Sequence, residues 1–319
     1  MASGKCTGYV VILASMTCLS GCYYMQAARG QLEVINKREP IDEVIAAPET
    51  PDDIAARLEL VREARQFAVD ELLLPDNDSY LSYADLGRDY VVWNVFAAPE
   101  FSLEPKSWCF PVAGCVNYRG YFAEASAIRK AGDLRKQGFD VVVGGVPAYS
   151  TLGRFDDPVL NTMMHWSDAD LVATIFHELA HQRLYVRDDT TFNESFASAV
   201  AEIGLARWLT AREEYDAFDA WAARREGRRR VIALVDEARA DLEALYASSM
   251  SRHEMRRGKE ARFEQLASEL PEAFTGELNN ARLASLALYE SRLQEFLDLL
   301  DECDGQLACF YERAAALAE

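Results

Sequence analysis

Two of the four histidines of this 319-residue chain lie four residues apart, in the segment HELAHQ at residues 177–182. Four residues advance about 400° around a helix, so His177 and His181 would share one face, one turn apart. Two imidazoles placed in this way can bind one zinc ion at about 2.0–2.1 Å. Glu178 would then reach the water that zinc holds, whose pKa falls to about 7. The segment therefore predicts a hydrolytic zinc site with Glu178 as general base.

The sequence around the two histidines favours a metal over ordinary hydrogen bonds. The rest of the segment is mostly apolar, with Leu171, Val172, Ile175, Phe176, Leu179 and Ala180. A buried polar side chain must find a partner, and one metal ion would satisfy both imidazoles. The alternative is that each imidazole hydrogen-bonds a neighbouring group. Because histidine is scarce elsewhere in the chain, we predict one zinc ion.

Glu194 is the predicted third zinc ligand. A catalytic zinc site has three protein ligands and one position for water. The short connector at residues 184–189 predicts an antiparallel helical hairpin, in which Glu194 faces His181 across roughly 8–10 Å. Two alternatives stay open. Glu194 could instead close a capping box with Thr191, and Glu202, two turns further on, could take its place as ligand.

Two further roles at such a site have several candidates. A ligating imidazole usually donates its other N–H to an acceptor, and the acids in reach along the sequence are Asp188, Asp189 and Glu202. A donor is also needed near the oxyanion that develops during hydrolysis. Tyr149 is the first candidate for this role, because it follows a predicted edge strand. The other candidates are Tyr185, Arg183 and His165.

Local signals predict the elements that would position these side chains. Ser167 predicts the start of the helix that carries HELAHQ, with Asp170 as its capping partner, and a second helix begins near Thr191. Residues 90–96 and 139–146 are rich in β-branched and aromatic side chains and predict strands. Further helices are predicted at residues 50–72 and 124–137, and over most of the chain after residue 213.

The first 22 residues predict export. Lys5 precedes an apolar run at residues 7–20, and Leu19-Ser20-Gly21-Cys22 resembles a bacterial lipobox. The run is shorter than the roughly 20 residues of a transmembrane helix. We therefore predict a signal peptide at residues 1–21 and lipidation of Cys22, rather than a plain secretory signal or a buried apolar segment. Tyr23, in place of Asp, is typical of lipoproteins sorted to the outer membrane, where the chain would face the periplasm.

The cysteine count also indicates an exported chain. Of seven cysteines, those at positions 6 and 18 would leave with the signal peptide, and the one at position 22 would carry lipid. An even remainder in an exported protein is typical of disulfide bonds. The predicted pairs are Cys109 with Cys115 and Cys303 with Cys309. Free buried thiols are the alternative, and neither pair has the C-x-x-C spacing typical of a four-cysteine metal site.

The formal net charge of −19 bears on the partners of the protein. A strongly acidic surface repels phosphate backbones, so we expect no nucleic acid partner. Half of the residues are hydrophobic, which is a globular composition. The basic cluster at residues 224–230 predicts a solvated helix face, with anionic lipid as a second possible contact.

With these motifs, the chain resembles the bacterial lipoprotein family of predicted aminopeptidases. The resemblance extends beyond the zinc motif to YYMQAARGQLEVINKREPI, CFPVAGCVNYRGYF, GGVPAYSTLGRFDDPVLNTM, HELAHQRLYV and TFNESFA. It implies a zincin fold of the glutamate-ligand type, with His177, His181 and Glu194 as ligands and Glu178 as base. The chain lacks the G-x-M-E-N stretch with which well-studied relatives of that type hold a substrate amine. The resemblance therefore leaves both exopeptidase and endopeptidase activity open.

Together these patterns predict a helix-rich α+β protein. A zincin-like core at residues 50–212, with a small sheet on the active-site helices, follows a lead-in at 22–49 and precedes a helical region at 213–319. The predicted function is a membrane-anchored, zinc-dependent peptidase, with aminopeptidase action as one form. The alternatives are a catalytically silent binding or scaffold lipoprotein and a zinc hydrolase of cell-wall peptides.

Overall fold

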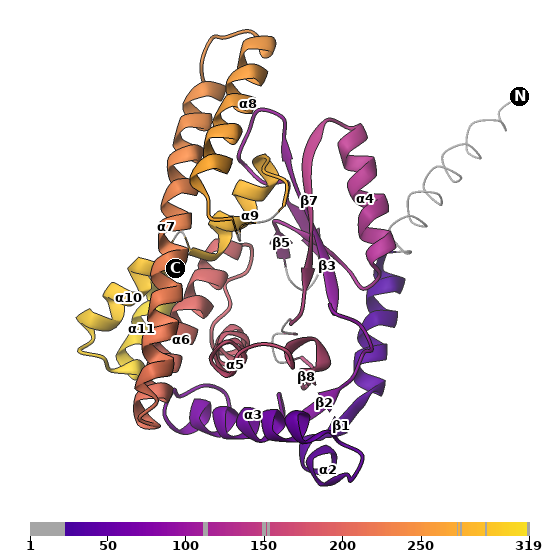
Figure 1. The fold of residues 1–319 in the computed structure, drawn as a ribbon, viewed down its shortest axis with the longest axis vertical. Coiled ribbons are helices and arrows are strands. Elements are labelled where there is room, and N and C mark those ends of the chain that lie inside the picture. The colour runs from indigo at the N-terminus through magenta and orange to yellow at the C-terminus, as the bar shows by residue number, and fades with distance from the viewer. Residues whose placement is uncertain are drawn as a thin grey trace, which may run out of the picture.

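The computed structural model describes residues 23–110, 114–148, 151, 154–272, 274, 276–290 and 292–317. The predicted signal peptide, the lipidation site Cys22 and the oxyanion candidate Tyr149 lie outside these residues. The described chain is a helix-rich α+β protein with small sheets and a long helical C-terminal region, as predicted (Figure 1). Within the described ranges, no helix combines the length and apolar character that crossing a bilayer requires.

The elements follow the order expected from the sequence. The strands are β1 (Arg38–Pro40), β2 (Ser82–Ala84), β3 (Val92–Pro99), β4 (Trp108–Phe110), β5 (Gly114–Val116), β6 (Arg119–Tyr121), β7 (Phe139–Val146) and β8 (Val159–Leu160). The helices are α2 (Ile41–Ala46), α3 (Asp52–Asp70), α4 (Glu124–Lys136), η1 (Asn161–Met163), α5 (Asp168–Arg183), α6 (Thr190–Ala211), α7 (Tyr215–Tyr246), α8 (Arg252–Glu269), α9 (Asn280–Glu290), α10 (Leu293–Glu302) and α11 (Leu307–Ala316). Residues 23–36 are helical as well.

A central antiparallel sheet has the strand order β6-β3-β7. β3 and β7 pair along their whole length, from Val92 opposite Val146 to Pro99 opposite Phe139. Successive side chains of a strand point to opposite faces. Val95 and Ala97 therefore pack against α4, whereas Phe96 and Ala98 pack against α9. Each face of the sheet is covered by a helix, which explains why β3 is apolar along most of its length.

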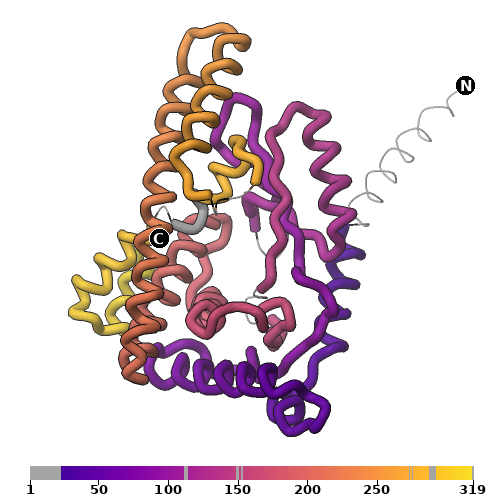
Figure 2. Tube along the Cα trace, in the orientation of Figure 1, coloured from indigo at the N-terminus to yellow at the C-terminus, as the bar shows by residue number. Residues whose placement is uncertain are grey.

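α5 and α6 form the helical hairpin predicted around HELAHQ. The Ser167 side chain accepts a hydrogen bond from the Asp170 backbone N–H and begins α5, as predicted. α5 packs on α3, which crosses the base of the molecule in Figure 2. α6 is enclosed by α5 on one side and by α9, α10 and α11 on others. Phe196 of α6 stacks on Phe310 of α11 with ring centroids 6.0 Å apart. This all-round burial holds α6 in place beside α5.

α7 runs along one side of the molecule and pairs with α8 (Figures 1 and 2). Its second half buries Val235, Ala238 and Leu242 in a cluster shared with α8 and α9. Its first half has no fully buried residue, although Phe218 and Trp221 pack partly against the main core. The first half of α7 therefore presents polar side chains close to α5 and α6.

Candidate metal centre

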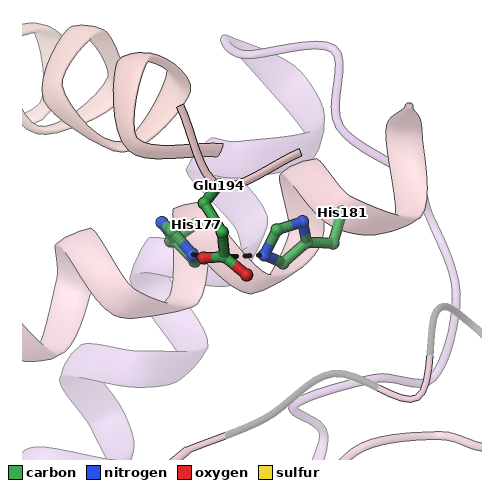
Figure 3. A group of neighbouring side chains, drawn as sticks. All are labelled: His177, His181 and Glu194. Atoms are coloured by element: carbon green, nitrogen blue, oxygen red, sulfur yellow. Dashed lines mark ion pairs between the residues drawn. The ribbon is translucent and has the colours of Figure 1, made fainter. Parts of the chain in front are cut away.

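The carboxylate of Glu194 lies between the rings of His177 and His181 (Figure 3). Both histidines come from α5 and the glutamate from α6. Glu194 Oε2 is 3.4 Å from His177 Nε2 and 3.9 Å from His181 Nε2. The two imidazole rings are nearly perpendicular, with centroids 4.8 Å apart. The structure thus brings together three potential ligand atoms from two adjacent helices.

The dimensions of this group fit a tetrahedral zinc ion. Donors bound at about 2.0–2.1 Å with tetrahedral angles lie roughly 3.4 Å from one another. The observed separations are close to that value, and all three ligand atoms lie within 4.8 Å of one another. Over the ranges that the structure describes, this is the group of histidine, cysteine and acidic side chains that can hold a metal ion.

The connector between α5 and α6 fixes the position of Glu194. Asn193 bonds the backbone of Val186 twice, donating to its carbonyl and accepting from its N–H, both at 2.7 Å. Asp188 has a φ of 69°, which turns the chain sharply before α6. Asp188 also accepts a hydrogen bond from the backbone N–H of Cys115 and so ties the connector to β5.

The capping role proposed for Glu194 is wrong. α6 begins after Asp189, whose side chain accepts a hydrogen bond from the Phe192 backbone N–H at 2.9 Å. Thr191 lies inside the helix and does not act as its N-cap. Since Asp189 already satisfies the start of α6, the Glu194 carboxylate is available to face the histidines.

Burial controls the chemistry of Glu178. Its side chain is buried, and burial raises its pKa to about 7. The charge of Glu194 raises this pKa further, whereas the charge of His177 lowers it. A carboxyl with a pKa near neutrality accepts and releases a proton readily at the pH of the cell. Glu178 also lines the same cavity as the three converging side chains.

The three converging side chains have linked protonation in the metal-free protein. Burial lowers the pKa of His181 to about 4 and so keeps it neutral. Burial also opposes protonation of His177, but its hydrogen bond to Glu194 and the charges of Glu178 and Glu194 outweigh burial and raise its pKa. Burial opposes ionisation of Glu194, yet its hydrogen bond to His177 and its electrostatic interaction with the two imidazoles lower its pKa overall. An ionised Glu194 beside a neutral His181 has the protonation that a metal cation requires of its ligands.

None of the three acids considered for orienting the histidines does so in the structure. Asp188 bonds Cys115, and Asp189 caps α6. Glu202 pairs with Arg225 and with Arg229. Among the described residues, the buried His181 Nδ1 has no hydrogen-bond partner.

One cavity of about 800 Å³ contains His177, His181 and Glu194. Its walls come from the N-terminal helix, the sheet, the β4–β5 hairpin, α5, α6 and α7, and they include Tyr23, Asn94, Phe110, Tyr118, Trp166, Tyr185 and Trp221. Tyr23 stacks on Phe110, with ring centroids 5.5 Å apart. A cavity of this size accommodates several residues of a peptide.

The oxyanion candidates fall in different places. Tyr185 lines the cavity. Arg183 instead stacks on the Tyr311 ring, 5.0 Å from its centroid, and the His165 ring lies beside Trp166 and outside the cavity lining. Tyr149 is outside the described residues, although the preceding Pro147 and Ala148 line the cavity.

The chain matches a known protein family. A family model described as "Putative aminopeptidase" matches residues 22–319. The chain belongs to this family. No curated protein and no solved structure matches it. The family description is that of a peptidase. The match covers both the hairpin of α5 and α6 and the C-terminal helices.

Tyr118 is a residue of the cavity wall that the sequence did not single out. It lies between β5 and β6, lines the cavity and is partly buried there. Burial raises its pKa, and the charges of Glu194 and Glu178 raise it further, so its hydroxyl keeps its proton. In the segment CVNYRGYF nothing distinguishes this tyrosine from Tyr121, because only the fold brings it beside α5.

The basic cluster of α7 is a second feature that the sequence analysis misplaced. Arg225 and Arg228 line the cavity together with Trp221, instead of forming a purely solvated face. The three residues are spaced at i, i+4 and i+7, so they share one face of the helix. That spacing was visible in the sequence, but it does not indicate whether a polar face meets bulk water or a polar cavity.

Both predicted disulfides are present. Cys109 and Cys115 are opposite each other in the β4–β5 hairpin and are bonded, as are Cys303 and Cys309. The first bridge secures the hairpin that contributes Phe110 and Val116 to the cavity. Together with the bond from Cys115 to Asp188, it links this wall to the connector that positions Glu194.

Proposed function

We propose that this family member is a zinc-dependent peptidase. His177, His181 and Glu194 would hold the metal ion, and Glu178 would act as general base. The observation that carries the proposal is the convergence of both Nε2 atoms on one oxygen of Glu194, at 3.4 and 3.9 Å. A buried glutamate next to this group, in a cavity large enough for a peptide, supports hydrolysis rather than a structural metal.

The residues around the group can be assigned separate catalytic roles in this proposal. A zinc ion held by His177, His181 and Glu194 would supply Lewis acidity to the scissile carbonyl and to the attacking water. Glu178 would take a proton from the attacking water and pass it to the leaving amine, a task suited to a buried carboxyl with a pKa near neutrality. Tyr118 and Tyr185 line the cavity and are the proposed donors to the developing oxyanion.

The family description favours removal of residues from the amino end of a peptide, and we include that activity in the proposal. We also propose that Cys22 is lipidated and holds the protein at the outer membrane, facing the periplasm. Tyr23, the next residue, lines the cavity, so the proposed anchor is adjacent in sequence to a residue of the cavity wall.

The proposal is tested by metal analysis and a peptide-library digest of the protein from residue 23 onward. We expect one zinc per chain and new peptide ends. The variant Glu178→Gln should keep its zinc and lose hydrolysis, because the isosteric amide cannot accept a proton. A Glu178→Gln protein that still turned over peptides would exclude this mechanism.

The histidines provide a matched control. His177→Ala and His181→Ala should each lose zinc, whereas His253→Ala, an exposed histidine on α8, should retain it. Equal zinc content in all three variants would rule out the proposed ligand set.

A further inference from the structure

The central sheet presents one polar side chain of β3 to the cavity. Side chains at alternate positions of a strand lie on the same face. On β3 the face opposite α4 carries Val92, Asn94 and Phe96, and the first two of these line the cavity. Phe96 packs beside Tyr118, with ring centroids 5.7 Å apart. Asn94 is therefore a carboxamide in an otherwise apolar row, on the wall of the cavity that also contains His177.

The Asn94 side chain has no hydrogen bond within the part of the chain that the structure describes, although the residue is only 6% exposed. A carboxamide has two N–H donors and one oxygen acceptor, and leaving them buried without a partner costs free energy. Asn280, which is also buried, shows the usual arrangement. Its Nδ2 donates to the carbonyls of Pro99 and Glu100, and its Oδ1 accepts from the Tyr246 hydroxyl. Asn94 thus offers an unused donor and acceptor at the cavity wall.

Glycines flank Asn94 on both neighbouring strands. Asn94 lies opposite Gly120 of β6 and Gly144 of β7. A Cβ atom on Gly120 would lie 3.2 Å from Asn94 Oδ1, so the carboxamide lies over the Gly120 backbone. A Cβ atom on Gly144 would meet nothing within 4 Å, so the other side of Asn94 borders open space. The absence of side chains at both positions leaves the carboxamide accessible to a group in the cavity.

We propose that Asn94 binds a main-chain amide of the substrate peptide. The inference rests on the proposed peptidase function and adds a substrate-binding residue to it. A peptide amide has one N–H and one C=O, so the Asn94 carboxamide can accept from the first and donate to the second. An α-ammonium group would use the oxygen alone. The acids of the described cavity wall, which are Asp170, Glu178, Glu194 and Glu202, all belong to α5 and α6 and not to the sheet. A neutral amide therefore matches this wall better than a cation.

The stability of two alanine variants tests whether Asn94 is a structural residue. Asn94→Ala removes a carboxamide without partners, so the midpoint of urea unfolding should stay the same or rise. Asn280→Ala is the matched control, because it leaves two carbonyls and a hydroxyl unpaired and should lower the midpoint by about 0.5 M or more. A comparable fall in Asn94→Ala would show that the side chain supports the fold and would overturn the inference.

Binding of tetra-alanine tests the ligand, with three analogues in which one peptide bond at a time is an ester. An ester lacks the N–H and is a weaker acceptor. Calorimetry with the Glu178→Gln protein gives each Kd. One ester should bind roughly 10-fold more weakly than tetra-alanine, and Asn94→Ala should weaken tetra-alanine by a similar factor. In Glu178→Gln/Asn94→Ala that ester and tetra-alanine should bind equally, which is the coupling expected of a direct contact. Asn36→Ala, an exposed asparagine outside the cavity lining, should keep the penalty of the ester.

Three outcomes would refute the assignment: no binding of tetra-alanine, additive effects of the ester and Asn94→Ala, or coupling of Asn94→Ala to N-acetylation of the peptide in place of the ester. The last would identify the ammonium group as the ligand. Calorimetry requires neither zinc nor turnover, so it separates this inference from the peptidase proposal. Additive effects in a protein that cleaves peptides overturn the role of Asn94 alone, whereas coupled effects in a protein without hydrolysis overturn the peptidase proposal alone.

Discussion

The cavity has two charged walls that hold their side chains in different ways. On α5 and α6, the histidines and both glutamates lie in apolar helices, and burial together with their mutual interactions shifts the pKa of each. On α7, Arg228 is exposed, whereas Arg225 is 17% exposed and pairs with Glu202. Burial alters the proton affinities of the first group, whereas the α7 wall combines an exposed guanidinium with one held in a charge pair. The comparison separates a wall defined by buried titratable groups from a wall defined by arginines.

The largest effect expected from this comparison is that of Glu194→Ala. It removes the acid between the two rings and should weaken zinc binding at least about 100-fold, with loss of hydrolysis. Metal titration against a chelating dye measures the affinity, and Glu264→Ala, an exposed acid on α8, is the control. Zinc affinity equal to that of the control variant would remove Glu194 from the ligand set.

Glu202→Gln tests the contact that joins the two walls. Glu202 belongs to α6 and holds Arg225 of α7, and both side chains are less than one-fifth exposed. Losing the acid leaves a largely buried guanidinium without its charged partner, so we expect the free energy of unfolding to fall by about 3 kcal/mol. Urea unfolding of Glu202→Gln, Arg225→Gln and the double variant measures the coupling. Additive losses would show that the pair does not link the walls.

Glu178→Gln should stabilise the metal-free protein at high pH. Burial raises the pKa of Glu178 to about 7 from the ordinary value of 4.5. The folded state therefore holds the proton more tightly, and stability from this group is lost as pH rises from 4.5 through 7. The neutral amide avoids that loss, so we expect a gain of about 3 kcal/mol at pH 8 and little at pH 4.5. Urea unfolding of the chelator-treated proteins at both pH values measures this gain. A difference in unfolding free energy that did not depend on pH would contradict the burial of Glu178.

The smallest predicted effect concerns the β4–β5 hairpin beside the buried wall. Gly114 has a φ of 74°, and a Cβ atom there would lie 2.2 Å from the Asp188 carboxylate oxygen. Gly114→Ala should cost about 1–2 kcal/mol of stability and disturb the connector before α6. We expect weaker zinc binding than in the unsubstituted protein. Gly87→Ala also replaces a glycine with positive φ but meets open space, so it is the control for backbone strain alone.

Local sequence signals predicted the elements well where a helix or strand depends on its own residues. β7 spans the predicted 139–146, and Ser167 caps α5. The approach of Glu194 to the histidines followed from helix periodicity and a short connector. The true cap of α6 did not, because Asp189 and Thr191 are both good capping residues and tertiary contacts of the connector select between them.

Residues contributed by distant segments could not be predicted from local pattern. Tyr118 reaches the site from the sheet, and Arg225 and Arg228 reach it from a helix that begins after α6. A polar helix face has the same periodicity whether it borders solvent or a wet cavity. Only the packing of α7 beside α6, through Trp221 and the Glu202 pair, distinguishes the two.

The position of Tyr23 has a consequence for how substrates arrive. Its ring forms part of the cavity wall, and its backbone is one peptide bond, about 3.8 Å between Cα atoms, from residue 22. With residue 22 acylated as proposed, no linker separates the acyl chains from the cavity. The protein would then encounter mainly peptides within a thin layer next to the bilayer. Peptides would reach this layer by diffusion along the membrane surface as well as from bulk solution. Peptides that adsorb to that surface would be turned over ahead of equally good ones in free solution.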